Sequence, residues 1–286
     1  MTTEPAATFR IGHWTDSVAR TGCTTIVFDR LVPTVVDVRG GAPGTRETDL
    51  LDAERTVGAV DAILLTGGSA HGLSAAEGVM QFLRESDRGV TTAAGRVPIV
   101  TAAVLYDLGV GAARWPTAES AYESCHSASA FESASWGRVG AGAGATYRKA
   151  WSGVDPLDGG IGAATIAVPD LGKAFAVVVV NAIGDTTDRR ADLLASRPQL
   201  DERTATSLMA VVLDGPADAR TLRRCAIAAH DGLARSMYPA HTMWDGDVAY
   251  VSALQAQDRN TAPADAFGWA IATELAVESA IRSITT

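Results

Sequence analysis

The sequence predicts a single layered α+β domain over residues 1–286. The first observation is a series of short apolar runs with the length and β-branched content of central strands. These runs span 24–29, 34–38, 62–68, 175–184, 207–215 and 248–254. They cluster without the strict strand–helix alternation of a doubly wound parallel sheet. In addition, 286 residues that are 47% hydrophobic can bury a large core, and no shift in composition marks a domain boundary.

Three longer stretches place apolar residues three or four positions apart, which predicts amphipathic helices that could cover both faces of a sheet system. The expected core-facing residues are Leu73, Ala76, Met80 and Leu83 in 69–86, Leu222, Cys225, Ala229 and Leu233 in 218–237, and Phe267, Ile271, Leu275 and Ile281 in 263–284. Segment 185–206 is the most polar connection and lies between two apolar runs. It is therefore predicted to be an exposed loop.

The charge and hydropathy of the chain limit the kinds of partner that it can bind. The formal net charge is −9 and no basic stripe is present, which argues against nucleic acid and anionic membranes as partners. No apolar run reaches the ~18 residues of a membrane-spanning helix, and the start of the chain lacks the basic-then-apolar pattern of a signal peptide. We expect a cytoplasmic protein that acts on small molecules or peptides.

Motifs for metals and cofactors are missing. Cys23, Cys125 and Cys225 are widely spaced without a C-x-x-C pair, so we expect buried thiols, and the five histidines show no H-x-x-x-H spacing. The run 140–145 reads G-A-G-A-G-A, which fails the dinucleotide-binding pattern G-x-G-x-x-G, and no G-x-x-x-x-G-K-[ST] occurs. We expect no cofactor and no metal, and interpret the glycines as turns where backbone passes close to backbone.

Four polar residues are candidates for a functional site. Asp245 and Asp247 precede a strand, two positions apart. Such a pair can orient a base or hold a cation, or it can be two solvated charges in an Asp-Gly turn, and the spacing favours neither. Lys149 follows small residues, so its ammonium is either partly desolvated or at the surface. Asn181 ends a run of valines, where its amide either satisfies a backbone group or donates to a ligand oxygen.

One junction in the chain is unusual. The stretch "ERTATSLMAVVLD" (202–214) passes from charged residues into an apolar run without a glycine or proline turn, although turn residues usually announce a strand. Three hydroxyl residues stand at this junction. The pattern needs a reason other than turn chemistry.

Blocks along nearly the whole chain resemble, in order, the L-aminopeptidase/D-esterase family of self-processing N-terminal-nucleophile hydrolases. This family includes β-peptidyl aminopeptidases and the nylon-oligomer endo-hydrolase. The blocks are "VDVRGGAPGTRETDLL" (36–51), "LLTGGSAHGLSAAEGVM" (64–80), "VPIVTAAVLYDLGVG" (97–111), "GRVGAGAGAT" (137–146), "VVVNAIGD" (178–185), "TSLMAVVLD" (206–214) and "AHDGLARSMYPAHTMWDGD" (229–247).

The resemblance implies a four-layer αββα sandwich with ornithine acetyltransferase-like topology, and it accounts for the junction. It implies self-cleavage between Ala205 and Thr206 into an α chain (1–205) and a β chain (206–286), which frees Thr206 as the N-terminal nucleophile. A hydroxyl is a poor nucleophile without a base beside it. A free α-amino group, with a reference pKa of about 7.7–8.0, can be that base.

The resemblance also implies roles for the other polar residues. Asn181 would help to bind the tetrahedral oxyanion, and Lys149 and Tyr106 would surround the nucleophile. Asp245 and Asp247 would orient it, kept ionised by an ion pair with the lysine.

The implied function is hydrolysis of small peptides or amide oligomers through a Thr206 acyl-enzyme. Two alternatives are open: ornithine-acetyltransferase-like acyl transfer to an amine, and an uncleaved, non-catalytic binding protein of the same fold. Aminopeptidase members hold the substrate ammonium with an acidic residue near the "AVLYD" block, where Ala103, Val104 and Leu105 are uncharged. Recognition of a free amino terminus is therefore open. The resemblance further implies a homo-oligomer, a tetramer of αβ units or larger.

Overall fold

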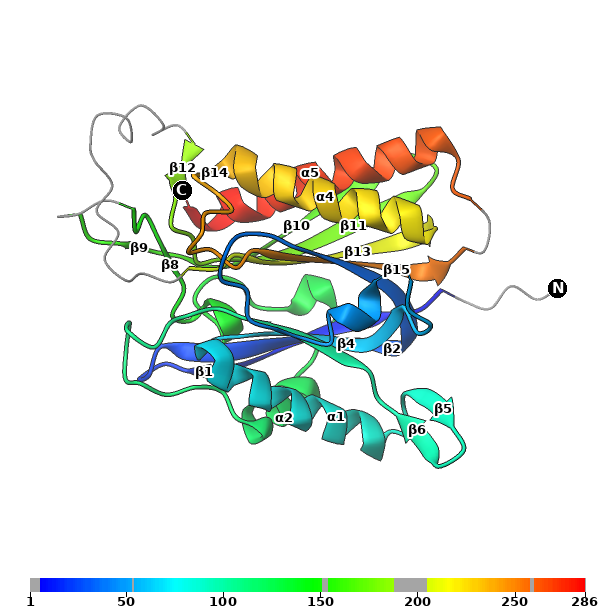
Figure 1. The fold of residues 1–286 in the computed structure, drawn as a ribbon, viewed down its shortest axis with the longest axis horizontal. Helices are drawn as coiled ribbons and strands as arrows, with labels where there is room; N and C mark the ends of the chain where they lie inside the picture. The colour runs from blue at the N-terminus through cyan, green and yellow to red at the C-terminus, as the bar shows by residue number, and fades with distance from the viewer. Residues whose placement is uncertain (1–5, 53, 151–153, 188–204, 258–259, 286) are drawn as a thin grey trace.

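Two sheets lie face to face between two pairs of helices (Figure 1). The computed structural model describes residues 6–52, 54–150, 154–187, 205–257 and 260–285. Helices α4 (Ala219–Ser236) and α5 (Pro263–Thr285) cover one sheet, and α1 (Ala76–Glu85) and α2 (Ala118–His126) cover the other. The four-layer αββα sandwich is thereby confirmed.

The sheet covered by α4 and α5 is the upper one in Figure 1, and the sheet covered by α1 and α2 is the lower one. The upper sheet contains β10 (Gly160–Val168), β11 (Gly172–Val180), β13 (Leu208–Ala217) and β15 (Val248–Ala256), in that spatial order. The lower sheet contains β1 (Phe9–Asp16), β2 (Thr21–Val38), β4 (Ala59–Thr66), β7 (Val100–Val104) and β3 (Thr45–Arg46). Short two-stranded pairs are formed by β5 (Val90–Thr92) with β6 (Gly95–Val97), β8 (Thr146–Tyr147) with β9 (Leu157–Asp158), and β12 (Asp185–Thr186) with β14 (Met237–Tyr238).

Strand β2 belongs to both sheets. Its first half pairs with β1 and β4, and its second half pairs with β15, with a register shift between Val27 and Val32. The runs 24–29 and 34–38, expected as two strands, are therefore two halves of one 18-residue strand. The intervening charged residues and Pro33 lie where the pairing partner changes, and this change is not visible in the sequence.

The continuous apolar runs are explained by burial of both faces of each sheet. In β11, Val177 and Val179 point into the core between the two sheets, while Ala176 and Val178 point toward α4 and α5. In β4, Ile63 faces the same inter-sheet core. A strand buried on both faces has no polar alternation, as in the strands of parallel sheets covered by helices.

The core-facing residues expected for 69–86 and 218–237 are buried or partly buried. The second of these helices is α4, whereas the first consists of a 3-10 helix, Ser69–Ala75, followed by α1. For α5 the prediction is right for Ile281, which is fully buried, and wrong for the other three residues. Phe267 is 68% exposed, and Ile271 and Leu275 are each 42% exposed. The buried face instead contains three alanines, Ala272, Ala276 and Ala280, together with Trp269, Thr273, Val277 and Ile281. Helix α5 lies very close to β10 at Ala280, because a methyl group on Gly162 would lie 2.1 Å from the Ala280 carbonyl oxygen.

The structure also bears on the predicted loop, the cysteines and the glycines. Most of the predicted loop 185–206 lies outside the described residues. The three cysteines are buried, and glycines do mark close backbone contacts, since a methyl group on Gly142 would lie 2.3 Å from the Ile161 nitrogen. Within the described part of the chain, no helix has the length and apolar character needed to cross a membrane.

Tyr250 connects the two sheets directly. Its side chain is fully buried, and its hydroxyl donates to the Ala102 carbonyl oxygen in β7 at 2.9 Å. We predict that Tyr250→Phe lowers the free energy of unfolding by about 1–2 kcal/mol, because it leaves this acceptor without its buried partner. Tyr122→Phe is the matched control: its hydroxyl bonds Glu85 at the surface, so a change within about 0.5 kcal/mol is expected. Equal losses in urea unfolding of the two variants would contradict this account.

Candidate active site

Three neighbouring strands of the upper sheet bring their polar ends to one edge. Asn181 follows β11 directly, Thr206 lies two residues before β13, and Asp247 lies directly before β15. Strands β11 and β13 are antiparallel, and β13 and β15 are parallel. The end of β11 therefore meets the beginnings of β13 and β15. Sheet pairing thus brings together chain segments that lie far apart in the sequence.

Thr206 is fixed at this edge by its main chain and its hydroxyl. Its N–H donates to the Asn181 carbonyl oxygen at 2.8 Å, which extends the β11–β13 ladder. Its Oγ1 donates to the carbonyl oxygen of Ala205, the preceding residue, at 2.5 Å. The residue is only 5% exposed. The hydroxyl thus lies against the carbonyl of the peptide bond that joins Ala205 to Thr206.

Ala205 is held like one residue of a strand. Its N–H donates to the Trp244 carbonyl oxygen at 3.1 Å, and its own carbonyl oxygen accepts from the Gly246 N–H at 3.1 Å. These two bonds form a parallel bridge with Asp245. The carbonyl oxygen of Ala205 therefore accepts two hydrogen bonds, one from a main-chain N–H and one from the Thr206 hydroxyl.

Lys149 and Asn181 form a buried polar pair beside the nucleophile candidate. The Lys149 ammonium donates to Asn181 Oδ1 at 2.7 Å, and the Thr146 N–H donates to the same oxygen at 3.0 Å. Asn181 Nδ2 donates to the main-chain oxygen of Tyr106 at 3.3 Å. Lys149 is 5% exposed, so the surface alternative is wrong. Tyr106 contacts the pair through its backbone, while its side chain is partly exposed.

Asp245 and Asp247 are each 1% exposed, so the alternative of two solvated charges is wrong as well. Asp247 accepts from the Ser207 N–H at 2.8 Å and from His241 Nδ1 at 2.8 Å. Asp245 accepts from the Thr242 N–H and hydroxyl and from the Ile183 N–H. Burial, aided by the charge of Asp247, raises the pKa of Asp245 to about 6 despite these hydrogen bonds.

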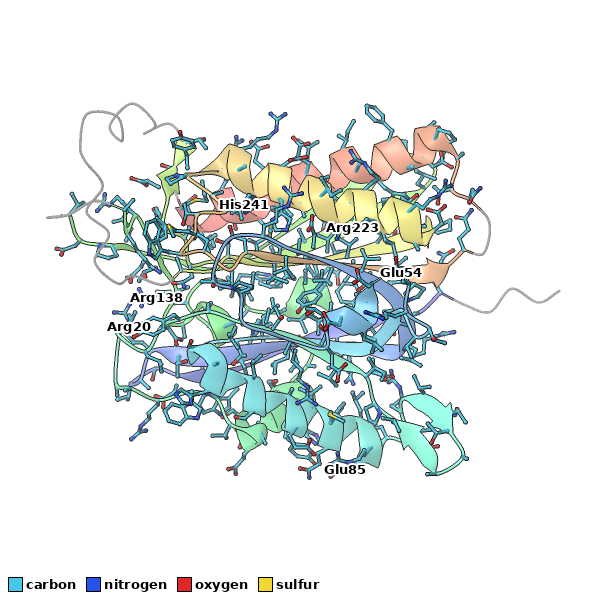
Figure 2. The ribbon with its side chains drawn as sticks, viewed as in Figure 1. Arg20, Glu54, Glu85, Arg138, Arg223 and His241 are labelled. Atoms are coloured by element: carbon cyan, nitrogen blue, oxygen red, sulfur yellow. The ribbon has the colours of Figure 1, made fainter. Side chains whose placement is uncertain are left out.

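His241 lies beside α4 (Figure 2). Its ring packs edge-on against that of His230, with the centroids 4.7 Å apart. His230 is fully buried, and its Nε2 contacts the main-chain oxygen of Asp37 at 3.0 Å. Burial lowers the pKa of His230 to about 4, so this ring packs as a neutral side chain.

A further buried carboxylate beside the site, Asp107, was missed from the sequence. It is 1% exposed, and its Oδ1 accepts from the Gly68 N–H at 2.7 Å. Burial raises its pKa, and hydrogen bonds together with the charge of Lys149 oppose that shift. The ion pair of Lys149 with Asp245 or Asp247 that the family resemblance implies stays a prediction. The signal was available, because Asp107 directly follows Tyr106 in the "AVLYD" block.

Together, the site holds a hydroxyl against an amide carbonyl, main-chain and side-chain N–H donors, and a buried ammonium. These are the components of acyl transfer: a nucleophile, donors for an oxyanion, and charged groups that set the local field.

Comparison with known proteins agrees with this geometry. The model of peptidase family S58 matches residues 7–285. The chain belongs to this family. An uncharacterised aminopeptidase of Mycobacterium leprae is 43% identical over 261 residues, which cover 80% of this chain and 69% of the relative.

Two further proteins extend the comparison. A 6-aminohexanoate-oligomer endohydrolase of Paenarthrobacter ureafaciens is 28% identical over 276 residues, 87% of this chain and 73% of that protein. The structure of an L-aminopeptidase D-Ala-esterase/amidase from Ochrobactrum anthropi, described as a variant of the Ntn hydrolase fold, aligns with a TM-score of 0.71 at 16% identity, over 96% of this chain and 82% of that one. This S58 protein is therefore a peptide or amide hydrolase with the fold of the N-terminal-nucleophile hydrolases.

The raised pKa of Asp245 predicts a specific dependence of stability on pH. The carboxyl of the unfolded chain titrates near 3.8 and that of the folded chain near 6. Between these values the folded protein keeps a proton that the unfolded chain releases. The stability that this group contributes is therefore complete below pH 3.8 and is lost as the pH rises through about 6.

We predict that the free energy of unfolding of the wild type, minus that of Asp245→Asn, falls by up to about 3 kcal/mol from pH 4 to pH 7. Urea unfolding at several pH values measures the difference. Asp231→Asn, on the exposed side of α4, is the matched control. Parallel stability curves for the wild type and Asp245→Asn would contradict the assignment.

Proposed function

We propose that this protein cleaves itself between Ala205 and Thr206 and then hydrolyses small peptides or amides with Thr206 as its N-terminal nucleophile. One observation carries the proposal: the Thr206 hydroxyl lies 2.5 Å from the carbonyl oxygen of the bond that joins it to Ala205. A hydroxyl held beside the carbonyl of its own peptide bond is placed for intramolecular attack.

The self-cleavage step follows from this contact. Thr206 Oγ attacks the Ala205 carbonyl carbon, and a C–O bond forms while the C–N bond breaks. The hydroxyl proton passes to the Thr206 nitrogen. Water then hydrolyses the ester, which leaves a carboxylate on Ala205 and a free α-amino group on Thr206. This amine is the base that the hydroxyl needs in every later turnover.

Substrate hydrolysis repeats the same chemistry on an external amide. Thr206 Oγ attacks the substrate carbonyl, and its proton passes through the α-amino group to the leaving amine. Water resolves the acyl-enzyme. Asn181 has two N–H donors, one of which bonds Tyr106, and the other is assigned to the oxyanion. The Lys149 ammonium fixes the Asn181 side chain and adds positive charge beside the developing oxyanion.

Asp245 and Asp247 position the main chain around the nucleophile. Asp247 accepts the N–H of Ser207, so it fixes the main chain directly after Thr206. Asp245 accepts from Thr242 and Ile183, which fixes the segment that pairs with Ala205. Both roles are positional, because these contacts are to main-chain and neighbouring groups.

The substrate is expected to be a short peptide or an amide oligomer, in keeping with the names of the similar proteins. Self-association and a cytoplasmic location stay predictions. The exposed apolar stripe of Phe267, Ile271 and Leu275 on α5 supports the first of these.

Replacement of the nucleophile tests the proposal. We predict that Thr206→Ala stays uncut and loses hydrolysis of alanyl p-nitroanilide and 6-aminohexanoate oligomers by on the order of a thousandfold or more. Thr206→Ser keeps a hydroxyl and retains both reactions at a reduced rate. The measurements are product release and denaturing electrophoresis of each purified variant. An active Thr206→Ala protein would rule out this mechanism.

A further inference from the structure

We infer that the place occupied by Ala205 is the site that receives the acyl residue of the substrate. The Ala205 subsite is defined here by the side chains of Ala150, Ile183 and Trp244 and by two main-chain groups, the Trp244 carbonyl oxygen and the Gly246 N–H. The inference rests on the proposed function, because it requires that Ala205 leaves after self-cleavage. The acyl group that this subsite receives is a small α-amino acid residue.

The first argument is that self-cleavage and substrate hydrolysis are the same chemical reaction. Self-cleavage and substrate hydrolysis both transfer an acyl group to the same atom, Thr206 Oγ. The reacting carbonyl carbon must therefore reach the same position in both reactions, and its oxygen must find the same donors. The chain's own Ala205 shows where that carbonyl lies before attack.

The main-chain contacts give the second argument. The Gly246 N–H donates to the Ala205 carbonyl oxygen at 3.1 Å, so it is a donor for the oxyanion in addition to Asn181. It is rigidly placed, since a methyl group on Gly246 would lie 2.4 Å from the Ala42 carbonyl oxygen. Departure of Ala205 leaves this donor and the Trp244 acceptor facing the nucleophile. A substrate residue can pair with both as an added strand residue does.

This pairing assigns a partner to the substrate nitrogen. The Ala205 N–H donates to the Trp244 carbonyl oxygen at 3.1 Å, and the α-nitrogen of a substrate residue occupies the equivalent place. The Trp244 carbonyl oxygen therefore recognises the nitrogen through a hydrogen bond.

Side-chain packing sets the size of the acyl residue. Ala205 is 1% exposed and packs with Ala150, which is 2% exposed, Ile183, which is 1% exposed, and the partly buried Trp244. Ile183 cannot yield easily, because its carbonyl oxygen accepts from the main chain of Lys149 and Ala150. A methyl side chain fits this space, whereas a leucyl or phenylalanyl side chain must displace a wall.

Three p-nitroanilides test the inference on the self-processed enzyme. Alanyl p-nitroanilide carries the predicted residue, leucyl p-nitroanilide has a larger side chain, and propionyl p-nitroanilide is the alanyl compound without its α-nitrogen. We predict that kcat/KM for the alanyl compound exceeds that for each of the other two by about tenfold, because overpacking and an unpaired buried acceptor each have a cost of that order. A propionyl or leucyl compound that reacts as fast as the alanyl one would overturn the inference.

Two variants test whether the Ala205 subsite is the part of the protein that favours alanyl over leucyl p-nitroanilide. Trp244→Ala removes one wall and is predicted to raise the leucyl-to-alanyl ratio of kcat/KM by about tenfold. Trp14→Ala is the matched control, because Trp14 is a partly buried tryptophan that packs on the far side of the lower sheet and should leave the ratio unchanged. An unchanged ratio in Trp244→Ala would overturn the assignment of the wall.

A measurement without external substrate separates the two proposals. Ala205→Leu is predicted to slow self-cleavage at least about tenfold, because the larger side chain displaces the carbonyl from Thr206 Oγ. Intact mass against time measures the rate, and the melting temperature verifies folding. Wild-type speed in Ala205→Leu would overturn the subsite and leave the nucleophile intact. A wild-type chain that never cuts contradicts the proposed function itself.

Discussion

The site depends on one constraint, the pairing of β13 between β11 and β15. The hydrogen bond from the Thr206 N–H to the Asn181 carbonyl oxygen extends this pairing to the nucleophile candidate. A register slip of one residue would turn Met209 and Val211 from the helix-covered core into the core between the sheets, and would exchange their neighbours in the opposite sense. The two hydrophobic cores therefore fix the position of the Thr206 hydroxyl.

Buried charge is the second feature of the site. Lys149, Asp107, Asp245 and Asp247 are all withdrawn from water, and burial of ionised groups is unfavourable unless they are paired or hydrogen-bonded. Here two of these groups contact the site directly: Lys149 bonds Asn181, and Asp247 bonds the main chain next to Thr206. A folded protein keeps such an arrangement where function requires it, at the expense of local stability.

The sequence predicts much of the fold because apolar periodicity records burial. The apolar runs at 175–184, 207–215 and 248–254 correspond to strands of the upper sheet. Helix α5 was found, but three of its four predicted core residues are exposed, and the close contact between Gly162 and Ala280 that orients the helix has no apolar signature. Thr206, Asn181 and Lys149 were identified through family resemblance. The contributions of Gly246 and Trp244 were not, because main-chain donors and acceptors carry no residue signature. Asp107 stands beside Tyr106 in the sequence, but its burial and its closeness to Lys149 arise from the tertiary fold.

The central claim is that the chain is cut before Thr206, and intact mass of freshly purified protein, combined with N-terminal sequencing, tests it most directly. The account predicts two polypeptides whose masses add up to the 29.6 kDa chain plus one water, the smaller beginning at Thr206. A single species that remains uncut after prolonged incubation would contradict it. The hydroxyl beside the Ala205 carbonyl would then be a structural contact in an uncleaved protein.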